Sequence, residues 1–207
     1  MIEETDEGII PIAILGGPKV GKSVLFSALS RNTGSPIIPT QNYTPTLGVH
    51  NLTIEKEFSI RNVARRIKLI IYDTAGNFRF KTLTTAHYKF FLGFIFIFDV
   101  NEPGSLEEMK KELDLVVARR DKTVGLIIAN LTPGNNNYDF QSLEILRSFY
   151  SRYGLTLIKT DLVRNEPPVE WDAVLLDLSR KIYEVYGNTI FQLILPPNTS
   201  NPLDCCP

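Results

Sequence analysis

The residues most clearly able to do chemistry form a short glycine-rich segment near the start of the chain. It reads GGPKVGKS and comprises Gly16, Gly17, Pro18, Lys19, Val20, Gly21, Lys22 and Ser23. The spacing fits the pattern G-x-x-x-x-G-K-[ST], and an apolar run precedes the segment while a helical pattern follows it. In such a loop, backbone N–H groups and the start of a helix surround a phosphate. We therefore expect these eight residues to bind a nucleotide.

Two side chains of this segment have distinct expected roles. The ammonium of Lys22 is expected to bridge the β- and γ-phosphates, and the hydroxyl of Ser23 is expected to ligate Mg²⁺. Pro18 removes one N–H donor from the loop, and Lys19 adds a positive charge beside the phosphates. Neither of these two residues takes away the groups that carry the chemistry.

The elements that must position this loop follow from the apolar pattern. Short apolar runs alternate with longer amphipathic segments, which predicts an α/β fold with a mostly parallel six-stranded sheet flanked by helices. Together with the glycine-rich motif, this fold is expected to be of the P-loop NTPase type. A capping box with Ser105 as N-cap and Glu108 three residues later is expected to open one helix. Strands are predicted over 9–15, 49–54 (within an alternating edge stretch, 50–60), 67–73, 93–100, 124–130 and 155–159, and helices over 21–31, from 105 onward, over 140–153 and over 169–186.

The bulk composition indicates one ordinary globular domain. The chain has 207 residues, 43% of them apolar and 22% charged, with a net charge of −1, which gives no support to nucleic-acid binding. No apolar run has the length of a membrane span, and the acidic start lacks a secretory signal pattern, so a cytoplasmic location is expected. We expect an N-terminal extension over 1–8, the domain over 9–187 and a flexible tail over 188–207.

Three further segments resemble a known family when they are taken together with the glycine-rich loop. They read YTPTLGVH (43–50), KLIIYDTAGNFRFKTLTTAHYK (68–89) and LGFIFIFDV (92–100). In order and spacing the chain resembles the Ras superfamily of small GTPases from about residue 9 to 186 and, within that superfamily, the Rab family. The resemblance implies a switch in vesicle transport that binds GTP or GDP with Mg²⁺.

The same resemblance assigns roles around the phosphates. Thr46 and Asp73 would join Ser23 in holding Mg²⁺, and the N–H of Gly76 would touch the γ-phosphate. Asn77 is the catalytic candidate, because it stands where the family usually has the glutamine that orients the attacking water. Asn is one methylene shorter than Gln, so we expect intrinsic hydrolysis to be slow.

The segments that would contact the base depart from the family pattern N-K-x-D. Asn130 is kept, but Leu131 replaces the lysine and Pro133 replaces the aspartate that reads guanine. In the later S-A-K loop we align Ile158 and Lys159 with the last two positions. These departures leave two alternatives open: a pseudo-GTPase that binds nucleotide weakly or without selectivity, and an NTPase with a changed base preference.

The end of the chain and the switch segments predict the partners. Cys205-Cys206-Pro207 resembles the paired cysteines that prenylation machinery modifies in Rabs, and unmodified thiols are the alternative. Prenylation would place the protein peripherally on the cytosolic face of intracellular membranes. Effectors, exchange factors and GTPase-activating proteins are expected at the switch segments. Asn51 and Tyr72 stand where Rabs usually carry Phe and Trp, so the partner set is expected to be unusual.

Overall fold

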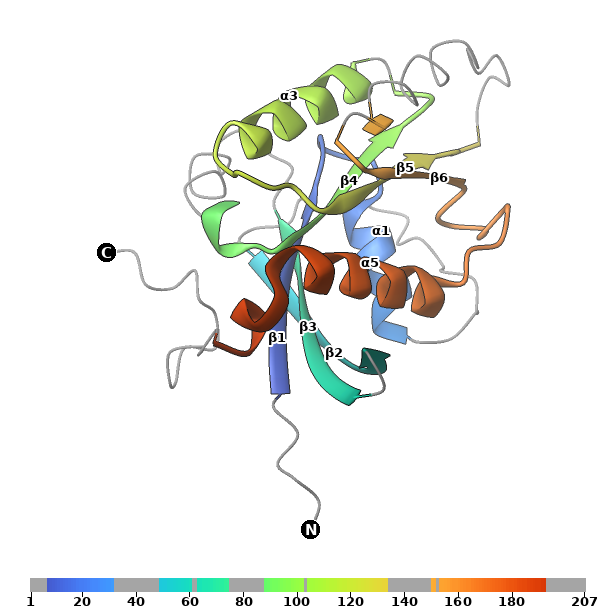
Figure 1. The fold of residues 1–207 in the computed structure, drawn as a ribbon. Helices are drawn as coiled ribbons and strands as arrows, with labels where there is room; N and C mark the ends of the chain where they lie inside the picture. Colours follow the sequence, from blue (N-terminus) through green and yellow to red (C-terminus); the bar gives the residue numbers. More distant parts are fainter. Residues whose placement is uncertain are drawn as a thin grey trace.

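The structure is a computed structural model that describes residues 7–31, 49–60, 63–74, 88–102, 104–133, 150–151 and 153–192. Helices and strands alternate along these segments, as the apolar pattern predicts (Figure 1). The elements are β1 (Glu7–Leu15), α1 (Lys22–Arg31), β2 (Val49–Ile60), β3 (Val63–Thr74), the 3-10 turn η2 (Tyr88–Phe90), β4 (Gly93–Asp99), α3 (Ser105–Val117), β5 (Gly125–Asn130), β6 (Thr156–Thr160), α5 (Trp171–Tyr186) and the 3-10 turn η3 (Gly187–Gln192).

The six strands form one sheet in the order β2-β3-β1-β4-β5-β6. Only the β2–β3 pair is antiparallel among the described strands, which confirms the prediction of a mostly parallel six-stranded sheet. The register pairs Asp99 with Asn130, and Asn130 with Thr160. The carboxyl ends of the parallel strands therefore meet at one edge, where ligands of open α/β sheets bind.

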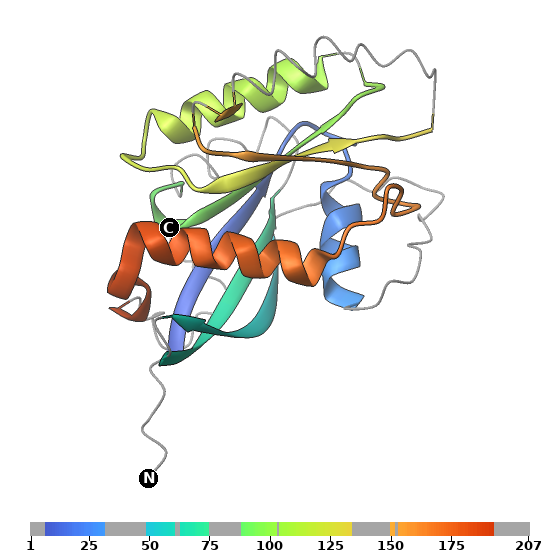
Figure 2. The ribbon, with the colours of Figure 1, turned by 45° about the vertical axis from the view of Figure 1, so that its right-hand side comes forward.

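Helices cover both faces of the sheet, so the domain has three layers (Figure 2). α1 and α5 pack on one face, and α3 packs on the other. The central strands β1, β4 and β5 are apolar on both faces for this reason, which is why their sequences lack alternation. The first core joins Ile10, Ile12 and Ile14 to Leu25, Leu29, Leu175, Leu178 and Ile182; the second joins Ala13, Phe94 and Phe96 to Met109, Leu113 and Val116. None of the described helices is long and apolar enough to span a bilayer.

The start of α3 differs from the predicted capping box. The N-cap residue is Gly104, with φ of 86°, and it has no side chain to cap the helix. Ser105 is the first helical residue, and its hydroxyl donates to the carbonyl of Asp99 at 2.7 Å and accepts the Asp99 N–H at 3.2 Å. Ser105 therefore fastens the helix to the end of β4, a long-range contact that the local motif does not reveal.

The predicted helix over 140–153 lies outside the described residues except for its last turn. Tyr150 in that turn is buried in the second core, and Gly154 follows it with φ of +67°. A glycine adopts this left-handed conformation without strain, so it ends the helix as expected. Gly187 is the C-cap of α5, with φ of 52° and ψ of −133°, and η3 begins at this residue.

The packed part of the chain extends past the expected boundary at residue 187. The turn η3 lies against β1, and the side chain of Ile190 is fully buried in the first core. Ile190, which the sequence prediction assigned to a flexible tail, therefore packs on the domain. Residues 193–207 lie outside the described part of the chain.

This packing predicts a stability effect at Ile190. Replacing Ile190 by Ala removes buried methyl groups and leaves a cavity, so we expect the free energy of unfolding to fall by about 2–4 kcal/mol. Thr189→Ala, at the exposed neighbouring position, is the control and should change stability by no more than about 0.5 kcal/mol. Urea unfolding measures both values, and equal stability of the two variants would mean that η3 does not pack on β1.

Candidate functional site

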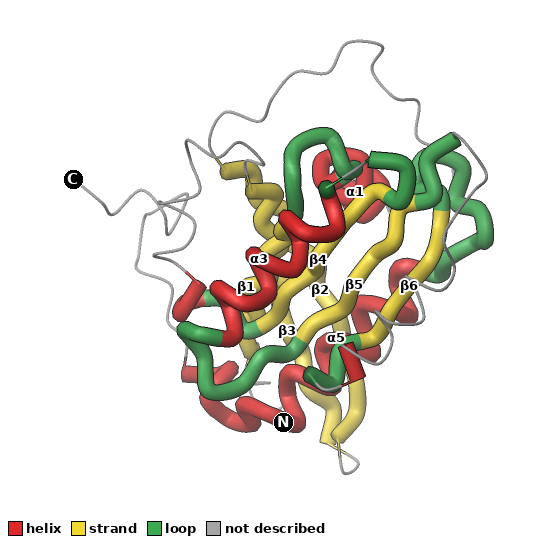
Figure 3. The backbone as a smooth tube through the Cα atoms, turned by 90° about the horizontal axis from the view of Figure 1, so that it is seen from above, coloured by secondary structure: helices red, strands yellow, loops and turns green. Residues whose placement is uncertain are grey.

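The glycine-rich loop follows β1 at the carboxyl edge of the sheet and leads directly into α1. Figure 3 shows the loops after the strands gathered at this edge, close to α1. Two glycines allow the loop to run so close to its neighbours. A Cβ atom at Gly16 would lie 2.3 Å from the carbonyl oxygen of Ile97, and one at Gly21 would lie 2.8 Å from Nδ2 of Asn130. Both positions also have positive φ, so larger residues would strain the loop as well as clash.

Lys22 places its ammonium inside the loop. Its Nζ donates to the carbonyl of Gly16 at 3.1 Å and to that of Gly17 at 2.5 Å, and the residue is only 6% exposed. Burying a cation away from water costs free energy, so a counter-charge at this position is stabilising. The loop therefore presents a buried positive charge at the start of a helix, which fits the phosphate of a nucleotide.

Ser23 and Asp73 meet beside this loop, although they are far apart in the sequence. The Ser23 hydroxyl donates to Oδ2 of Asp73 at 2.7 Å, and Asp73 is 3% exposed. Hydroxyl and carboxylate oxygens are ligands that Mg²⁺ prefers, so the pair fits the ion that the sequence predicts here. Burial raises the pKa of the adjacent Tyr72 to about 12, so its phenol adds no charge at neutral pH. The other expected contacts, Thr46, Gly76 and Asn77, lie outside the described residues.

Pro18 and Lys19 form the exposed rim of the loop. Lys19 has φ of 62°, a left-handed conformation that costs a non-glycine residue about 1–2 kcal/mol. On the opposite side a carboxylate oxygen of Glu108 on α3 lies against Gly17, only 2.2 Å from where a Cβ would be. The sequence assigned Glu108 to a capping box and so missed that it lies beside the loop.

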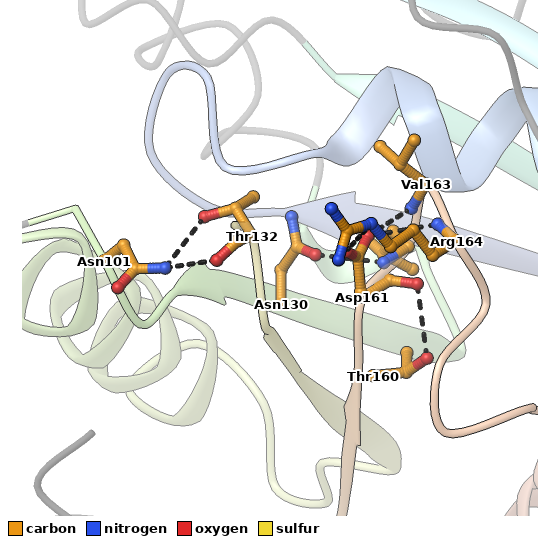
Figure 4. A network of polar contacts seen from close by, with 8 residues as sticks. Asn101, Asn130, Thr132, Thr160, Asp161, Val163 and Arg164 are labelled. Carbon is orange, nitrogen blue, oxygen red and sulfur yellow. Dashed lines mark hydrogen bonds and ion pairs between the residues drawn. The ribbon is translucent and has the colours of Figure 1, made fainter. Parts of the chain in front are cut away.

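Asn130, at the end of β5, joins the glycine-rich loop to the loop after β6. Figure 4 shows Asn130 beside Asp161 and Val163 of the latter loop. Its Nδ2 donates to the carbonyl of Val20 at 3.0 Å, and its Oδ1 accepts the N–H of Leu162 at 3.1 Å. Asn130 is 2% exposed, so both bonds are shielded from water. The structure thus gives Asn130 a positioning role that is independent of any contact with a base.

A second polar group holds the segment after Asn130 in place (Figure 4). The hydroxyl of Thr132 donates to the carboxylate of Asp99, 2.7 Å from Oδ1 and 2.8 Å from Oδ2. The side-chain amide of Asn101 donates to the carbonyl oxygen of Thr132. The sequence missed these three residues, although the position of Asp99 at a strand end on the same edge is the signal that points to them.

The structure corrects the alignment of the second base-contact loop. Ile158 and Lys159 lie within β6, opposite Ile128 and Ala129, and are not in the loop after it. Ile158 lines a pocket of about 260 Å³ between β5, β6 and α5. Both residues therefore belong to the strand and not to the loop that the alignment assumed, because the apolar strand runs further.

The loop beside Asn130 is instead formed by Asp161, Leu162 and Val163. Asp161 is 4% exposed, and its Oδ1 accepts the N–H groups of Val163 at 2.9 Å and Arg164 at 3.1 Å, which closes a tight turn. Leu162 is buried, and its Cδ1 lies 3.0 Å from where a Cβ at Gly21 would be. The residues that take the place of S-A-K thus hold the loop together and pack it on the phosphate side.

Comparison with known proteins agrees with this geometry. A sequence model of the Ras family matches residues 11–142, more than half of the chain. The chain belongs to the Ras family. Ras-related protein RABA5e of Arabidopsis thaliana is 26% identical over 181 residues, which are 87% of this chain and 79% of that protein. Ras-related protein Rab-8B of Dictyostelium discoideum is 24% identical over 208 residues, covering 96% and 93% of the two chains.

A third relative, Ras-related protein Rab-1C of Dictyostelium discoideum, is 29% identical over 158 residues, 73% of this chain and 71% of its own. These relatives place the chain among the Rab proteins of the Ras family. Small GTPases of this family bind GTP and GDP, usually with Mg²⁺. The buried Lys22 and the Ser23–Asp73 pair suit that ligand, whereas Leu131 and Pro133 stand where the family pattern N-K-x-D has charged residues.

The two bonds of Asn130 predict a large loss of stability when its side chain is removed. Asn130→Ala leaves the buried carbonyl of Val20 and the buried N–H of Leu162 without this partner, so we expect a loss of about 2–4 kcal/mol. Asn51→Ala, at an exposed site on β2, is the matched control and should stay within about 0.5 kcal/mol of the parent. Urea unfolding measures both variants. Equal midpoints, with the same slope of the unfolding free energy against urea concentration, would contradict the positioning role of Asn130.

Proposed function

We propose that this Rab-family chain is a nucleotide-dependent switch that binds GTP or GDP with Mg²⁺. The observation that carries the proposal is the arrangement around Lys22, which lies 6% exposed inside the glycine-rich loop. Beside it, the hydroxyl of Ser23 and the carboxylate of Asp73 lie 2.7 Å apart. The backbone N–H groups from Gly16 to Ser23 would hold the phosphates together with Lys22. Ser23, Thr46 and Asp73 would hold the ion, which neutralises phosphate charge when bound.

The base is expected to be held more weakly than the phosphates. Pro133 has no carboxylate to accept hydrogen bonds from guanine, and Leu131 offers only apolar packing. A hydrogen bond to a charged group contributes about 1.5–3 kcal/mol, so affinity for GTP should be roughly 10- to 150-fold lower than with an aspartate at this position. Discrimination between guanine and adenine should fall for the same reason.

Hydrolysis is expected to be slow because Asn77 reaches less far than the glutamine it replaces. A displacement of about 1 Å in the group that orients the water costs on the order of 10²-fold in rate. Thr46 and Gly76 would report the third phosphate by ordering the switch segments around it. Activating proteins that supply their own catalytic groups would accelerate the reaction.

Membrane traffic is the process that the Rab relationship supports for this chain. Two prenyl chains on Cys205 and Cys206 would anchor it to the cytosolic face of intracellular membranes, because two lipid chains hold a protein stably where one does not. Prenylation machinery, exchange factors, activating proteins and effectors are the proposed partners. Tyr72, which stands where many Rabs have Trp, is 2% exposed and packs against Phe91, so it offers partners little surface.

Chromatography of the nucleotide released from freshly purified, denatured protein tests the proposal directly. We expect guanine nucleotide with a substantial share of GTP, since slow hydrolysis preserves the triphosphate. Asn77→Gln should shift the share toward GDP, and Lys22→Ala should lower occupancy by at least about tenfold. Lys111→Ala, on the exposed side of α3, should leave both quantities unchanged. Protein that carries no nucleotide and shows no thermal shift with GTP, GDP or ATP would overturn the switch.

The pseudo-GTPase alternative is favoured by one specific observation. Leu131 and Pro133 follow Asn130, whose side-chain bonds are explained by the fold alone. Under this alternative the protein is a Rab-shaped binding module that uses nucleotide weakly or not at all.

The substitution Pro133→Asp separates the alternatives. In a working GTPase it restores a carboxylate at the base and should raise GTP affinity roughly 10- to 150-fold while leaving ATP affinity nearly unchanged. Pro133→Ala is the matched control, because it removes the proline ring without adding a charge. Isothermal titration of both variants gives the affinities, and equal GTP affinity for the two would count against a base site at this position.

A further inference from the structure

A basic pocket lies at the end of the domain opposite the candidate nucleotide site. It is lined by residues of η2, of the turn between α3 and β5, and of the end of α5. Figures 1 and 2 show these three segments side by side, at the far end of β4 and β5 from the glycine-rich loop. The pocket has a volume of about 420 Å³, which falls in the range of small-ligand sites. Its lining comprises Lys89, Arg119, Arg120, Asp121, Lys122, Val185, Tyr186 and Thr189.

Arg120 builds the floor of this pocket and fixes its walls. Its guanidinium donates to the carbonyls of Tyr88 at 3.1 Å and Lys89 at 2.9 Å, which fastens η2. It also donates to the hydroxyl of Tyr186 at 2.6 Å and lies 5.4 Å from the centre of that ring. The Tyr186 hydroxyl in turn donates to the carbonyl of Lys122 at 2.8 Å. The backbones that carry Lys89 and Lys122 are therefore held in fixed positions on two sides of the pocket.

The pocket is positively charged, although the whole chain has a slightly negative net charge. Four cations and one carboxylate line it, giving a local charge of +3, whereas the full chain has a net charge of −1. Lys89, Arg119 and Lys122 are exposed, while Arg120 is half-buried and occupied by its structural bonds. Three solvent-facing cations around one concavity attract an anion such as a phosphate group.

An exposed aromatic ring adjoins the cations. Phe90 is 55% exposed. Among the residues that the structure describes, no other large apolar side chain is exposed to this degree. The ammonium of Lys89 lies 5.1 Å from the centre of its ring. A ring beside cations is the arrangement that suits the interface between lipid headgroups and acyl chains.

The chain leaves the domain at the same end. η3 contributes Thr189 to the pocket, and residues 193–207 follow it without a single lysine or arginine. Lipid chains on Cys205 and Cys206 would thus lie within a short length of chain from this surface, and the segment that carries them supplies no positive charge. Basic residues near an anionic membrane surface each strengthen binding appreciably.

We propose that the pocket formed by Lys89, Arg119, Arg120 and Lys122, with Phe90 at its edge, binds the phosphate headgroups of an anionic membrane. The folded domain thereby supplies the electrostatic attraction that residues 193–207 lack. This inference extends the membrane role in the proposed function, and it requires no nucleotide and no lipid modification of the chain.

Sedimentation of the full-length, unprenylated protein with lipid vesicles tests the proposal. Binding to vesicles of phosphatidylcholine mixed with phosphatidylserine should exceed binding to pure phosphatidylcholine by about tenfold or more and should weaken with salt. Lys89→Gln combined with Lys122→Gln should weaken the anionic binding by roughly 30-fold. Lys111→Gln combined with Arg180→Gln, at exposed sites outside the pocket, is the control of equal charge and should weaken binding far less.

Two outcomes would overturn the proposal. One is equal weakening by both double variants, which would assign the attraction to overall charge. The other is tight binding of soluble inositol hexaphosphate without preference for anionic vesicles, which would make the pocket a site for a free phosphate compound. Phe90→Ala separates these sources further, since it should weaken binding to vesicles and leave the soluble anion unaffected. Nucleotide content measured on the same preparations keeps failure of the switch distinguishable from failure of this site.

Discussion

One buried side-chain amide holds the functional edge of this domain together. Asn130 bonds the carbonyl of Val20 on one side and the N–H of Leu162 on the other, and water is excluded from both bonds. The close approach of Gly21 to Nδ2 of Asn130 is possible only because that position lacks a side chain. The loop that carries the phosphate-binding groups and the loop after β6 therefore behave as one unit. The presence of Asn130 is explained by this role whether or not a base is bound.

The phosphate side and the base side of the site differ in how strongly their groups are constrained. Lys22 and Asp73 are buried; the Lys22 ammonium donates to the carbonyls of Gly16 and Gly17, and the Ser23 hydroxyl donates to Asp73. Leu131 is half-buried and Pro133 is exposed. The polar network beyond them joins this segment to the end of β4, because the hydroxyl of Thr132 donates to the carboxylate of Asp99. Under the proposed function, a site of this kind would recognise polyphosphate more than it recognises a particular purine.

The strands were predictable because burial on both faces produces short apolar runs with clear ends. The glycine-rich loop was predictable because the spacing G-x-x-x-x-G-K-[ST] between a strand and a helix is specific for phosphate-binding loops. Ile158 and Lys159 were wrongly aligned with the S-A-K loop because an apolar strand has no internal feature that shows where it ends. The loop that follows reads Asp161-Leu162-Val163, so it does not contain S-A-K as a guide to the alignment. Ser105 was misassigned because its partner, Asp99, is not a local one. The basic pocket could not be predicted, since its cations come from segments that only the folded chain brings together.

The glycine-rich loop and the basic pocket lie at opposite ends of the sheet. The glycine-rich loop lies at the carboxyl ends of the parallel strands, and the basic pocket around Arg120 lies where β4 and β5 begin. Held against a bilayer by the pocket end, the domain would stand upright with its strands pointing outward. Proteins arriving from the aqueous phase would then meet the nucleotide-bearing edge first, and lipid would not obstruct them.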